Sequence, residues 1–439
     1  MTELYSIFLE HPVVTTDSRD CPEGSIFFAL KGDTFNGNAY AKAALDKGCA
    51  YAVVDEAQYA LDDRYILVPD VLTTLQQLAR EHRRALNTPI IGITGTNGKT
   101  TTKELVATVL SQKYNVLYTQ GNFNNHIGVP KTLLRLTKEH DIAVIEMGAN
   151  HPGEIKTLVE IVEPDCGLIT NVGKAHIEGF GSFEGVIRTK GELYDFLRQK
   201  ADSKVFIDTD NEHLMGISEG LNLVPYVGGE VIACDPFLRF KWESPQCSVH
   251  SAQCSVTSSQ SSMFNVQCHE VQTHLIGAYN MKNMLAAATV GLEFGITPEQ
   301  ISEALAGYVP TNNRSQLTIT QHNKLIVDTY NANPTSMMAA LQNFVLMSVE
   351  PKMAILGDMG ELGSISGEEH QKIVRYLQDN HISNVWLVGS EFSKIESPYR
   401  KFADVAAVKE ALATERPEGQ YILIKGSNSN RLFELPELL

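Results

Sequence analysis

The sequence contains a glycine-rich stretch whose residue types and spacing are suited to binding the phosphates of a nucleotide. Gly95 and Gly98 can adopt backbone angles that bulkier residues avoid, so the chain can wrap closely around a phosphate group. Lys99 supplies a cation for the β- and γ-phosphates, and Thr100 supplies a hydroxyl group for Mg²⁺. These residues predict a site for ATP or GTP.

The sequence on either side of this stretch indicates a strand-to-helix turn. Residues 88–91 form a short apolar run suited to a buried strand, and residues 104–110 carry apolar side chains at helical spacing. The first N–H groups of such a helix point at a bound phosphate. Ile93 stands where the general phosphate-loop pattern has glycine, so a tight turn with a chance Gly-Lys-Thr is the alternative interpretation. The strand and helix context favours the phosphate loop.

Polar residues that could hold a metal follow two further apolar runs. Glu146 comes after residues 143–145 and is placed to bind Mg²⁺ directly or through water, although in isolation a helix cap or a surface ion pair would be the better interpretation. His176 follows the run 166–171 in a glycine-rich loop, where a functional and a structural histidine fit the sequence equally well. Lys190 has the spacing of a solvated helix lysine, and nothing local marks it out.

The composition is that of a globular protein with a strong negative charge. The chain has 439 residues, 43% of them hydrophobic and 20% charged, and its length suggests about three domains. The formal net charge of −16 argues against nucleic acid as a partner, because such binding rests on Lys and Arg neutralising phosphates. No apolar run reaches the roughly 18 residues that a membrane span needs, and the first residues lack the features of a signal peptide. We expect no membrane insertion and a cytoplasmic location.

Residues 227–276 differ from the rest in being rich in Ser, Gln and β-branched residues. They predict short antiparallel strands joined by polar turns, with low-complexity disorder as the alternative for residues 244–262. The seven cysteines include no Cys-x-x-Cys pair, so free buried thiols in a reducing compartment are the favoured interpretation. An irregularly spaced zinc site is the alternative, in a cluster of Cys234, Cys247, Cys254, Cys268, His250 and His269.

The pattern of apolar runs predicts an α/β protein with three domains that would bring these residues together. Residues 1–85 indicate a small mixed α/β domain, and residues 86–309 a central doubly wound phosphate-loop domain whose sheet is mostly parallel with an antiparallel portion. Residues 310–439 indicate a Rossmann-like α/β domain without its own phosphate loop. In such sheets ligands bind beyond the carboxyl ends of the strands, where Glu146 and Asn171 fall.

With these motifs in order, the chain resembles the Mur ligases, the ATP-dependent amide ligases that build the peptide of bacterial cell-wall precursors. The resemblance covers nearly the whole chain and is carried by residues 95–101, 122–130, 175–192 and 328–337. The family has its own form of the phosphate loop, which accounts for Ile93. The branch most similar to this chain joins D-alanyl-D-alanine to UDP-N-acetylmuramoyl-tripeptide through an acyl phosphate, giving UDP-N-acetylmuramoyl-pentapeptide, ADP and phosphate. The resemblance implies an enzyme of peptidoglycan synthesis, and a monomer is the default expectation for its oligomeric state.

Other functions remain open at this point. The chain could be another Mur-type ligase that adds a single amino acid to a nucleotide precursor, or a folylpolyglutamate synthase; the loop around His176 and the segment from Asn331 argue against both. From another class, it could be a phosphate-loop nucleotide switch or motor. Those proteins usually place Asp at the strand end that contacts Mg²⁺, and they lack a second α/β unit.

The resemblance also implies roles for single residues in binding ATP and metal. ATP would be bound by Gly95, Thr96, Asn97, Gly98, Lys99, Thr100 and Thr101, with Asn280 and Asn283 at the adenine, Arg314 at a phosphate and Asp328 at the ribose. Thr100 and Glu146 would hold one Mg²⁺, and His176 with a carbamylated Lys190 (N6-carboxylysine) would hold a second. A carbamate attracts a cation that an ammonium group would repel. Lys99, His176 and Lys190 would be the catalytic residues.

The two substrates would be bound by residues of all three domains. Ser18 and Arg19 would contact the UDP-sugar, Thr119, Asn122, Asn124 and Asn125 the muramoyl group, and Asn331, Asn333 and Ser336 the dipeptide or γ-phosphate side. Residues 1–85 would bind the UDP-muramoyl peptide, residues 86–309 ATP, and residues 310–439 would close on ATP and bind the incoming dipeptide. The turn Asn36-Gly37-Asn38 departs from the Asp-Gly-His that the family commonly has, which leaves its role open.

Overall fold

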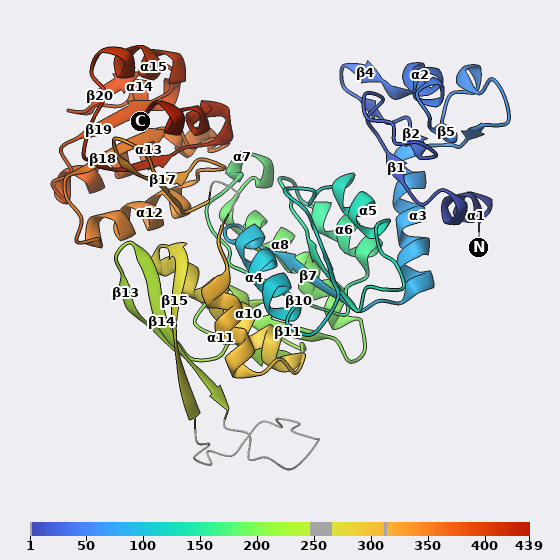
Figure 1. The fold of residues 1–439 in the computed structure, drawn as a ribbon, viewed down its shortest axis with the longest axis horizontal. Helices are drawn as coiled ribbons and strands as arrows, with labels where there is room; N and C mark the ends of the chain where they lie inside the picture. Colours follow the sequence, from blue (N-terminus) through green and yellow to red (C-terminus); the bar gives the residue numbers. More distant parts are fainter. Residues whose placement is uncertain (1, 246–265, 311–313) are drawn as a thin grey trace.

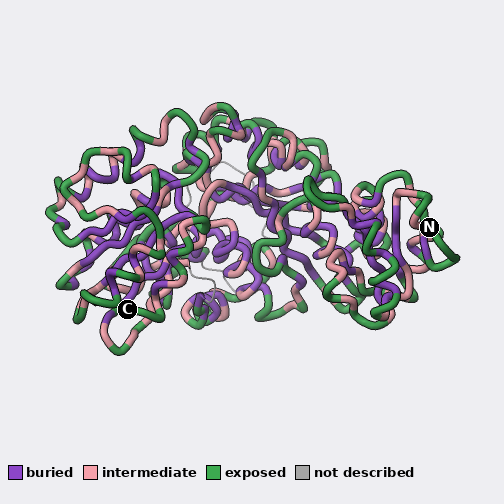
Figure 2. The backbone as a smooth tube through the Cα atoms, turned by 90° about the horizontal axis from the view of Figure 1, so that it is seen from above, coloured by how far each residue is buried: buried purple, intermediate pink, exposed green. Residues whose placement is uncertain are grey.

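The computed structural model describes residues 2–245, 266–310 and 314–439. Figure 1 shows three bodies in sequence order, with the N-terminal and C-terminal bodies standing apart on either side of a central one. Buried residues run through the interior of each body (Figure 2), so each has a core of its own. The predicted α/β fold class is confirmed. Among the described residues, no helix is long and apolar enough to cross a membrane.

The N-terminal body is a parallel sheet of four strands in the order β1-β2-β5-β6, with helices on both faces. Because successive strand residues point to opposite faces, Phe28 and Val53 share a core with helix α3, whereas Phe27 and Ala52 share one with α2. The elements are α1 (Glu3–Glu10), β1 (Val14–Thr15), β2 (Ile26–Phe28), β3 (Lys31–Gly32), β4 (Phe35–Asn36), η1 (Gly37–Tyr40), α2 (Ala41–Asp46), β5 (Tyr51–Val54), η2 (Ala57–Tyr59), β6 (Tyr65–Leu67) and α3 (Val71–Leu86).

The central body is built on a parallel sheet of six strands in the order β12-β11-β10-β7-β9-β8. Ile91 and Val144 face helices α4, α10 and α11, and Ile90 and Ile145 face α5, α6 and α8, so both faces of the sheet are covered. The elements are β7 (Ile90–Thr94), α4 (Lys99–Leu110), β8 (Val116–Tyr118), α5 (Gly128–Leu133), β9 (Ile142–Glu146), α6 (Glu154–Val162), β10 (Cys166–Ile169), α7 (Ile177–Phe180), α8 (Phe183–Arg198), β11 (Lys204–Ile207), α9 (Glu212–Gly216), β12 (Leu223–Pro225), η3 (Ala278–Asn280), α10 (Met281–Glu293) and α11 (Pro298–Gly307).

A separate antiparallel sheet follows the central one, in the order β13-β14-β15. It consists of β13 (Gly229–Cys234), β14 (Phe237–Pro245) and β15 (Val266–Ile276). The antiparallel prediction is confirmed, but β14 and β15 have 9 and 11 residues and are not short. Phe240 and Trp242 lie fully buried against α10 and α11, which explains the aromatic residues in this polar segment. Most of the segment 244–262 and the zinc candidates Cys247, Cys254 and His250 lie outside the described residues.

The C-terminal body has a sheet of six strands in the order β16-β17-β21-β18-β19-β20, in which only β16 runs antiparallel to its neighbour. Helices α12, α13 and α14 pack on one face, and α15 packs on the other. The elements are β16 (Gln316–Ile319), β17 (Lys324–Asp328), α12 (Pro334–Leu346), β18 (Lys352–Gly357), η4 (Gly363–Ile365), α13 (Ser366–Asp379), β19 (Val385–Val388), α14 (Ser390–Lys394), β20 (Arg400–Phe402), α15 (Val405–Thr414), β21 (Tyr421–Lys425), η5 (Asn428–Asn430), η6 (Leu432–Glu434) and η7 (Pro436–Leu438).

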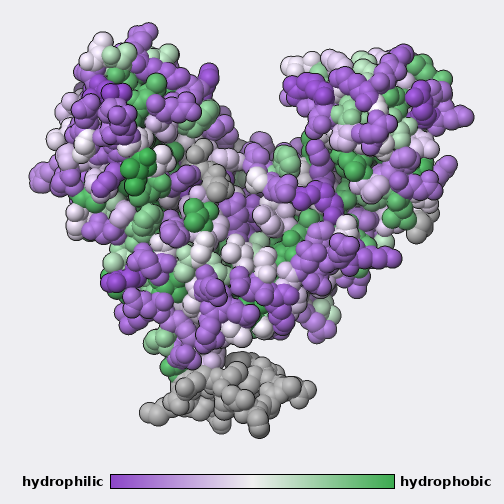
Figure 3. Space-filling model, viewed as in Figure 1, coloured by the Kyte–Doolittle hydropathy of each residue, from purple (hydrophilic) through white to green (hydrophobic). Residues whose placement is uncertain are grey.

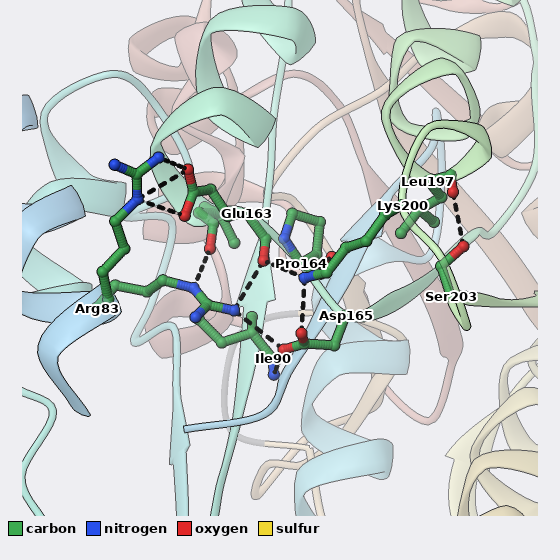
Figure 4. A network of polar contacts seen from close by, with 10 residues as sticks. Arg83, Ile90, Glu163, Pro164, Asp165, Leu197, Lys200 and Ser203 are labelled. Atoms are coloured by element: carbon green, nitrogen blue, oxygen red, sulfur yellow. Dashed lines mark hydrogen bonds and ion pairs between the residues drawn. The ribbon is translucent and has the colours of Figure 1, made fainter. Parts of the chain in front are cut away.

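A network of charged residues ties α3 to the amino ends of the central strands (Figure 4). Arg83, whose side chain is 6% exposed, donates to the carbonyl oxygens of Val162 at 3.0 Å and Glu163 at 2.8 Å, and to the Asp165 carboxylate at 3.1 Å. Asp165 also accepts from the backbone N–H of Ile90 at 2.8 Å. Lys200 donates to the other Asp165 oxygen at 2.6 Å. The last turn of α3 is thereby fixed to the starts of β7 and β10.

Candidate functional site

A cavity of 770 Å³ lies where the three bodies meet, at the carboxyl ends of the central strands. Figure 3 shows the surface hollowed between the two outer bodies, above the central one. Most of the sequence-predicted site residues line the cavity, namely Thr96, Asn97, Gly98, Lys99, Thr100, Thr101, Asn122, Asn124, Asn125, Glu146, His176, Asn280, Asn283, Arg314, Asp328, Asn331 and Ser336. Gly95, Thr119, Lys190, Asn333, Ser18 and Arg19 are not among the residues that line it.

The glycine-rich stretch is a strand-to-helix turn between β7 and α4. Gly95 and Gly98 have φ angles of +141° and +78°, which L side chains rarely adopt. The Nζ atom of Lys99 folds back onto the turn and donates to the carbonyl oxygens of Gly95 at 2.8 Å and Thr96 at 2.9 Å. Burial lowers the pKa of Lys99 to about 8, and the nearby Arg314 also lowers it while Glu146 acts in the opposite direction. A bound polyphosphate would favour the ammonium form of this lysine and raise its pKa.

Two residues at the end of β10 hold the turn in place. The amide of Asn171 accepts from the backbone N–H of Asn97 and donates to the Asn97 carbonyl oxygen, both at 3.0 Å. The hydroxyl of Thr170 donates to the same carbonyl oxygen at 2.6 Å. The sequence analysis located Asn171 at this edge of the sheet, because it directly follows a predicted strand, but assigned it no function.

Glu146 is 1% exposed and lies beside the start of α4. Its Oε1 atom accepts from the Thr100 hydroxyl at 3.2 Å and from the Asn124 amide at 2.8 Å. Its Oε2 atom is buried and has no hydrogen-bond partner among the described residues, and the ammonium group of Lys103 lies 3.8 Å away. A buried carboxylate oxygen beside a hydroxyl group is the kind of oxygen ligand set that Mg²⁺ binds, so these residues fit that ion.

Thr119 supports Glu146 rather than facing the cavity. Its side chain is fully buried, and its hydroxyl oxygen accepts from the backbone N–H of Glu146 at 3.0 Å. Its contact with the muramoyl group stays a prediction. Lys103, whose side chain is completely buried next to Glu146, was missed by the sequence analysis, because a lysine in the first turns of a helix looks solvated.

His176 sits at the start of α7 with a left-handed φ of +51°. Its Nδ1 atom contacts a carboxylate oxygen of Glu361 from the C-terminal body. Burial lowers the pKa of His176, and Lys99 and Lys190 lower it further, although Glu361 acts in the opposite direction. The imidazole is therefore held towards its neutral form.

Lys190 lies one layer behind the cavity wall. Its Nζ atom donates to the carbonyl oxygen of Ala149 at 3.1 Å and stands 5.1 Å from the ring centroid of Phe180. The residue is 2% exposed, and burial together with the nearby Lys99 holds its pKa well below the usual range. The solvated lysine that local spacing indicated is thus wrong, because the α8 face that carries Lys190 packs against the core.

The predicted adenine and ribose residues are already hydrogen-bonded to other groups of the chain. Asn283 donates to the Oδ1 atom of Asn280 at 2.9 Å and accepts from the Thr102 hydroxyl at 3.1 Å. Asp328 accepts from the Nζ atom of Lys425 at 2.6 Å. Lys425, which lines the cavity, therefore fixes the carboxylate that is predicted to meet the ribose.

Arg314 comes from the C-terminal body and reaches the cavity. Its guanidinium carbon lies 3.9 Å from the ring centroid of Tyr330, so the plane of the group is supported by the aromatic face. Its Nε atom is buried and finds no hydrogen-bond acceptor within the part of the chain that the structure describes. A half-buried guanidinium whose Nε–H has no acceptor in the described chain, close enough to Lys99 to lower its pKa, is suited to an anionic ligand.

The remaining predicted substrate residues divide between the two outer bodies. Asn333 caps α12 and donates to the Asn97 side chain at 2.7 Å, so it joins the C-terminal body to the phosphate loop. Ser18 and Arg19 lie in the N-terminal body, where Arg19 pairs with Asp17 at 2.7 Å. Neither residue lines the cavity, and the UDP-sugar assignment stays a prediction.

The turn Asn36-Gly37-Asn38 has a structural role in the N-terminal body. Asn38 is 1% exposed; it donates to the Asp55 carboxylate at 2.8 Å and accepts from the Asp55 backbone N–H at 3.0 Å. Lys31 pairs with the same carboxylate at 2.9 Å. The two asparagines thus hold the hairpin β3-β4 against the end of β5.

Three family descriptions match consecutive parts of the chain: "Mur ligase family, catalytic domain" over residues 12–83, "Mur ligase middle domain" over 93–291, and "Mur ligase, glutamate ligase domain" over 313–428. The chain is 34% identical over 447 aligned positions to the UDP-N-acetylmuramoyl-tripeptide–D-alanyl-D-alanine ligase of Escherichia coli (strain K12), covering 100% of this chain and 95% of that protein.

Two solved structures resemble this one along nearly their full length. The structure of MurF from Acinetobacter baumannii has a TM-score of 0.82 and 30% identity, covering 97% of this chain and 93% of that one. The structure of the MurF ligase from Thermotoga maritima in complex with ADP has a TM-score of 0.84 and 26% identity, covering 100% and 98%.

Proposed function

This chain belongs to the Mur ligase family, and from that membership we propose that it joins D-alanyl-D-alanine to UDP-N-acetylmuramoyl-tripeptide at the expense of ATP. The observation that carries the proposal is the single cavity in which the phosphate loop, Glu146 and the C-terminal residues Arg314 and Asp328 meet. The substrates are those in the names of its full-length relatives. A structure of one relative with ADP supports ATP as the nucleotide.

The reaction follows from what a carboxylate needs in order to accept an amine. An oxygen of the tripeptide carboxylate attacks the γ-phosphorus of ATP, ADP leaves, and an acyl phosphate forms. The amine of D-alanyl-D-alanine then attacks the acyl carbon and loses a proton, and the C–O bond to phosphate breaks. Lys99, the N–H groups at the start of α4 and Arg314 stabilise charge on the transferring phosphoryl group.

We assign Thr100 and Glu146 as the residues that hold Mg²⁺, because the Glu146 Oε2 atom is buried next to a hydroxyl group and lacks a hydrogen bond within the described chain. When bound, Mg²⁺ supplies positive charge against the phosphate oxygens. His176, which lines the cavity, is the candidate ligand for a second ion.

Lys190 is proposed to carry a carbamate that supports this second site. The unprotonated amine that its low pKa favours can attack the carbon of CO₂, forming an N–C bond and releasing one proton. Incubation with ¹³C-labelled bicarbonate is expected to give a carbamate ¹³C signal that Lys190→Ala abolishes together with activity. Full activity in Lys190→Ala would exclude the modification as a requirement.

The three bodies are proposed to divide the binding of the substrates. Residues 1–85, with Ser18 and Arg19, would bind the UDP-muramoyl peptide, and residues 310–439, with Asn331, Asn333 and Ser336, the dipeptide. Residues 86–309 would bind ATP. UDP-linked precursors and ATP are cytoplasmic metabolites, so the reaction is assigned to the cytoplasm.

An isotope experiment tests the central step. The carboxyl oxygens of the UDP-muramoyl tripeptide are labelled with ¹⁸O, and the phosphate released with D-alanyl-D-alanine is examined by mass spectrometry. We expect one label to pass into phosphate, because the acyl phosphate breaks at the carbon–oxygen bond. Unlabelled phosphate would overturn the mechanism, and a panel of muramoyl intermediates and amines separates this function from that of other ligases in the family.

A further inference from the structure

His176 and Glu361 meet across the boundary between the central and C-terminal bodies. His176 lies in the loop between β10 and α7, and Glu361 lies in the loop after β18. The imidazole Nδ1 contacts the Glu361 carboxylate, and the backbone N–H of Glu178 donates to the Glu361 carbonyl oxygen at 3.4 Å. His176 lines the 770 Å³ cavity, whereas Glu361 lines a second cavity of 720 Å³ at the carboxyl ends of the C-terminal strands.

Both residues hold an unusual backbone conformation. The φ angles are +51° at His176 and +60° at Glu361, and each such conformation costs an L residue about 1 kcal/mol or more. Strained backbones of this kind persist only where the surrounding structure fixes them. Two such residues contact one another here, with 27% of the His176 side chain and 56% of the Glu361 side chain exposed. The conformation of both loops and the backbone hydrogen bond from Glu178 to Glu361 hold the two side chains together.

The contact determines which nitrogen of the imidazole carries the proton and which has a lone pair free to bind a metal ion. A neutral imidazole carries a proton on one nitrogen and a lone pair on the other, and only the lone pair can bind a metal ion. A carboxylate at Nδ1 accepts the Nδ1–H and leaves the lone pair on Nε2. Histidines that bind metals in proteins commonly donate their other N–H to a carboxylate in this way.

We propose that Glu361 is a positioning residue for His176, and that it sets the Nε2 lone pair of the imidazole only while the C-terminal body is docked. The role of that lone pair as a metal ligand rests on the proposed function, whereas the tautomer does not. In this arrangement the C-terminal body contributes to the central site through a carboxylate that does not itself touch the ligands. Docking of the C-terminal body therefore brings Glu361 to His176 and sets the imidazole tautomer in the same step.

The same boundary offers a matched control. Lys174 of the His176 loop pairs with Glu369 of α13 at 3.2 Å, and Glu369 also accepts from Lys372 at 3.0 Å. This contact also joins a central residue to a C-terminal carboxylate, but no contact joins Glu369 to His176 in the described structure. Glu369→Gln therefore weakens the boundary without removing the partner of the imidazole.

The test measures the tautomer directly, by ¹⁵N NMR of the histidine side chains in the full-length protein without nucleotide. We expect His176 to carry its proton on Nδ1 in the unaltered protein and in Glu369→Gln, and to shift towards Nε2–H or a mixture in Glu361→Ala. Glu361→Gln keeps an acceptor and is expected to retain most of the Nδ1–H form. An unchanged His176 signal in Glu361→Ala would overturn the proposal, as would an Nε2–H form in the unaltered protein.

A second measurement tests the consequence for metal binding. With ADP present, Mn²⁺ affinity measured by electron paramagnetic resonance is expected to fall about 10- to 100-fold in Glu361→Ala, the range typical for loss of a partner behind a metal-bound histidine, and less than about twofold in Glu369→Gln. Equal losses in both variants would contradict the proposal. If the unaltered protein shows the expected tautomer but no ligation of D-alanyl-D-alanine, the proposed function fails while the positioning of His176 stands.

Discussion

The two ends of the central sheet differ in how their charged side chains are paired. At the amino ends, Arg83, Asp165 and Lys200 satisfy one another and the neighbouring carbonyl oxygens (Figure 4). At the carboxyl ends, Glu146 and Arg314 keep buried polar atoms that have no partner among the described residues. The same strands therefore end in a saturated network on one side and an unsatisfied one on the other.

The presence or absence of hydrogen-bond partners distinguishes the charged groups that stabilise the fold from those that are available to bind a ligand. A buried charge that is fully hydrogen-bonded repays part of its desolvation cost, whereas an unpaired one lowers stability until something binds it. Lys99 lies between the two cases, because its Nζ atom donates to two carbonyl oxygens and yet burial lowers its pKa to about 8. Substitutions at the two ends should accordingly change different quantities.

The largest effect is expected for Lys99→Met at the carboxyl end. Removing a cation that faces the transferring phosphoryl group is expected to lower kcat about 10²- to 10³-fold. The free energy of unfolding should stay constant or rise, because the charge that is lost is one that partial desolvation already disfavours. Phosphate release with both substrates and urea unfolding measure the two quantities. If the variant lost stability and kept its activity, Lys99 would be a structural residue and not a catalytic one.

A somewhat smaller loss is expected for Glu146→Gln. The amide keeps the size of the side chain and can still accept from Thr100 and Asn124, but it binds Mg²⁺ weakly. We expect kcat at a fixed Mg²⁺ concentration to fall about 10²-fold and to recover in part as Mg²⁺ is raised. ADP formation as a function of Mg²⁺ concentration checks this. An unaltered Mg²⁺ dependence would mean that Glu146 is only a structural residue.

At the amino end, Arg83→Met should change stability and leave catalysis intact. Three acceptors lose their donor, so the free energy of unfolding is expected to fall by about 3 kcal/mol. Well below the unfolding transition, kcat should stay within about twofold. Urea denaturation followed by circular dichroism gives the first value.

Arg84→Met is the control for this prediction. Its side chain is 57% exposed and pairs with Glu163 at 2.5 Å, so its loss should cost at most about 1 kcal/mol. If Arg84→Met lowers the free energy of unfolding as much as Arg83→Met does, burial of the arginine does not explain the contribution of this network to stability.

The smallest effect is a proton taken up when nucleotide binds. Above pH 8 the free protein holds Lys99 increasingly uncharged, and a bound polyphosphate favours the ammonium form and raises its pKa. Binding should therefore take up as much as one proton near pH 9 and none from this group well below pH 8, and affinity should fall about tenfold per pH unit above that value. Calorimetry in buffers of different ionisation enthalpy measures the uptake, and Lys99→Met should abolish it.

Much of the fold could be predicted from short segments. The run before Gly95 and the helical spacing after Lys99 predicted β7 and α4, and the run ending at Glu146 predicted β9. These predictions succeeded because strand and helix patterns depend on residues that are close in the chain. The same local reasoning failed for Lys190, because a lysine on a helix looks solvated until the face that carries it is known.

The candidate site was predicted only in part. Thr100 lines the cavity as its motif predicted, and Asn283, which only the family resemblance indicated, lines it as well. Thr119 turned out to support Glu146, and Lys103 and Glu361 carried no signal at all. Their surroundings are set by how separate elements pack, which short patterns do not encode.

By itself, the sequence determined the phosphate loop, the alternation of strands and helices, and the strand ends at which polar residues gather, because each depends on neighbours along the chain. Tertiary structure alone decided that Lys190 is buried beside Phe180, that Arg314 stacks on Tyr330, and that His176 meets Glu361 from 185 residues away. Those environments arise when three separately folded bodies are brought to one edge of a sheet, and the energies of burial and pairing there belong to the assembled whole.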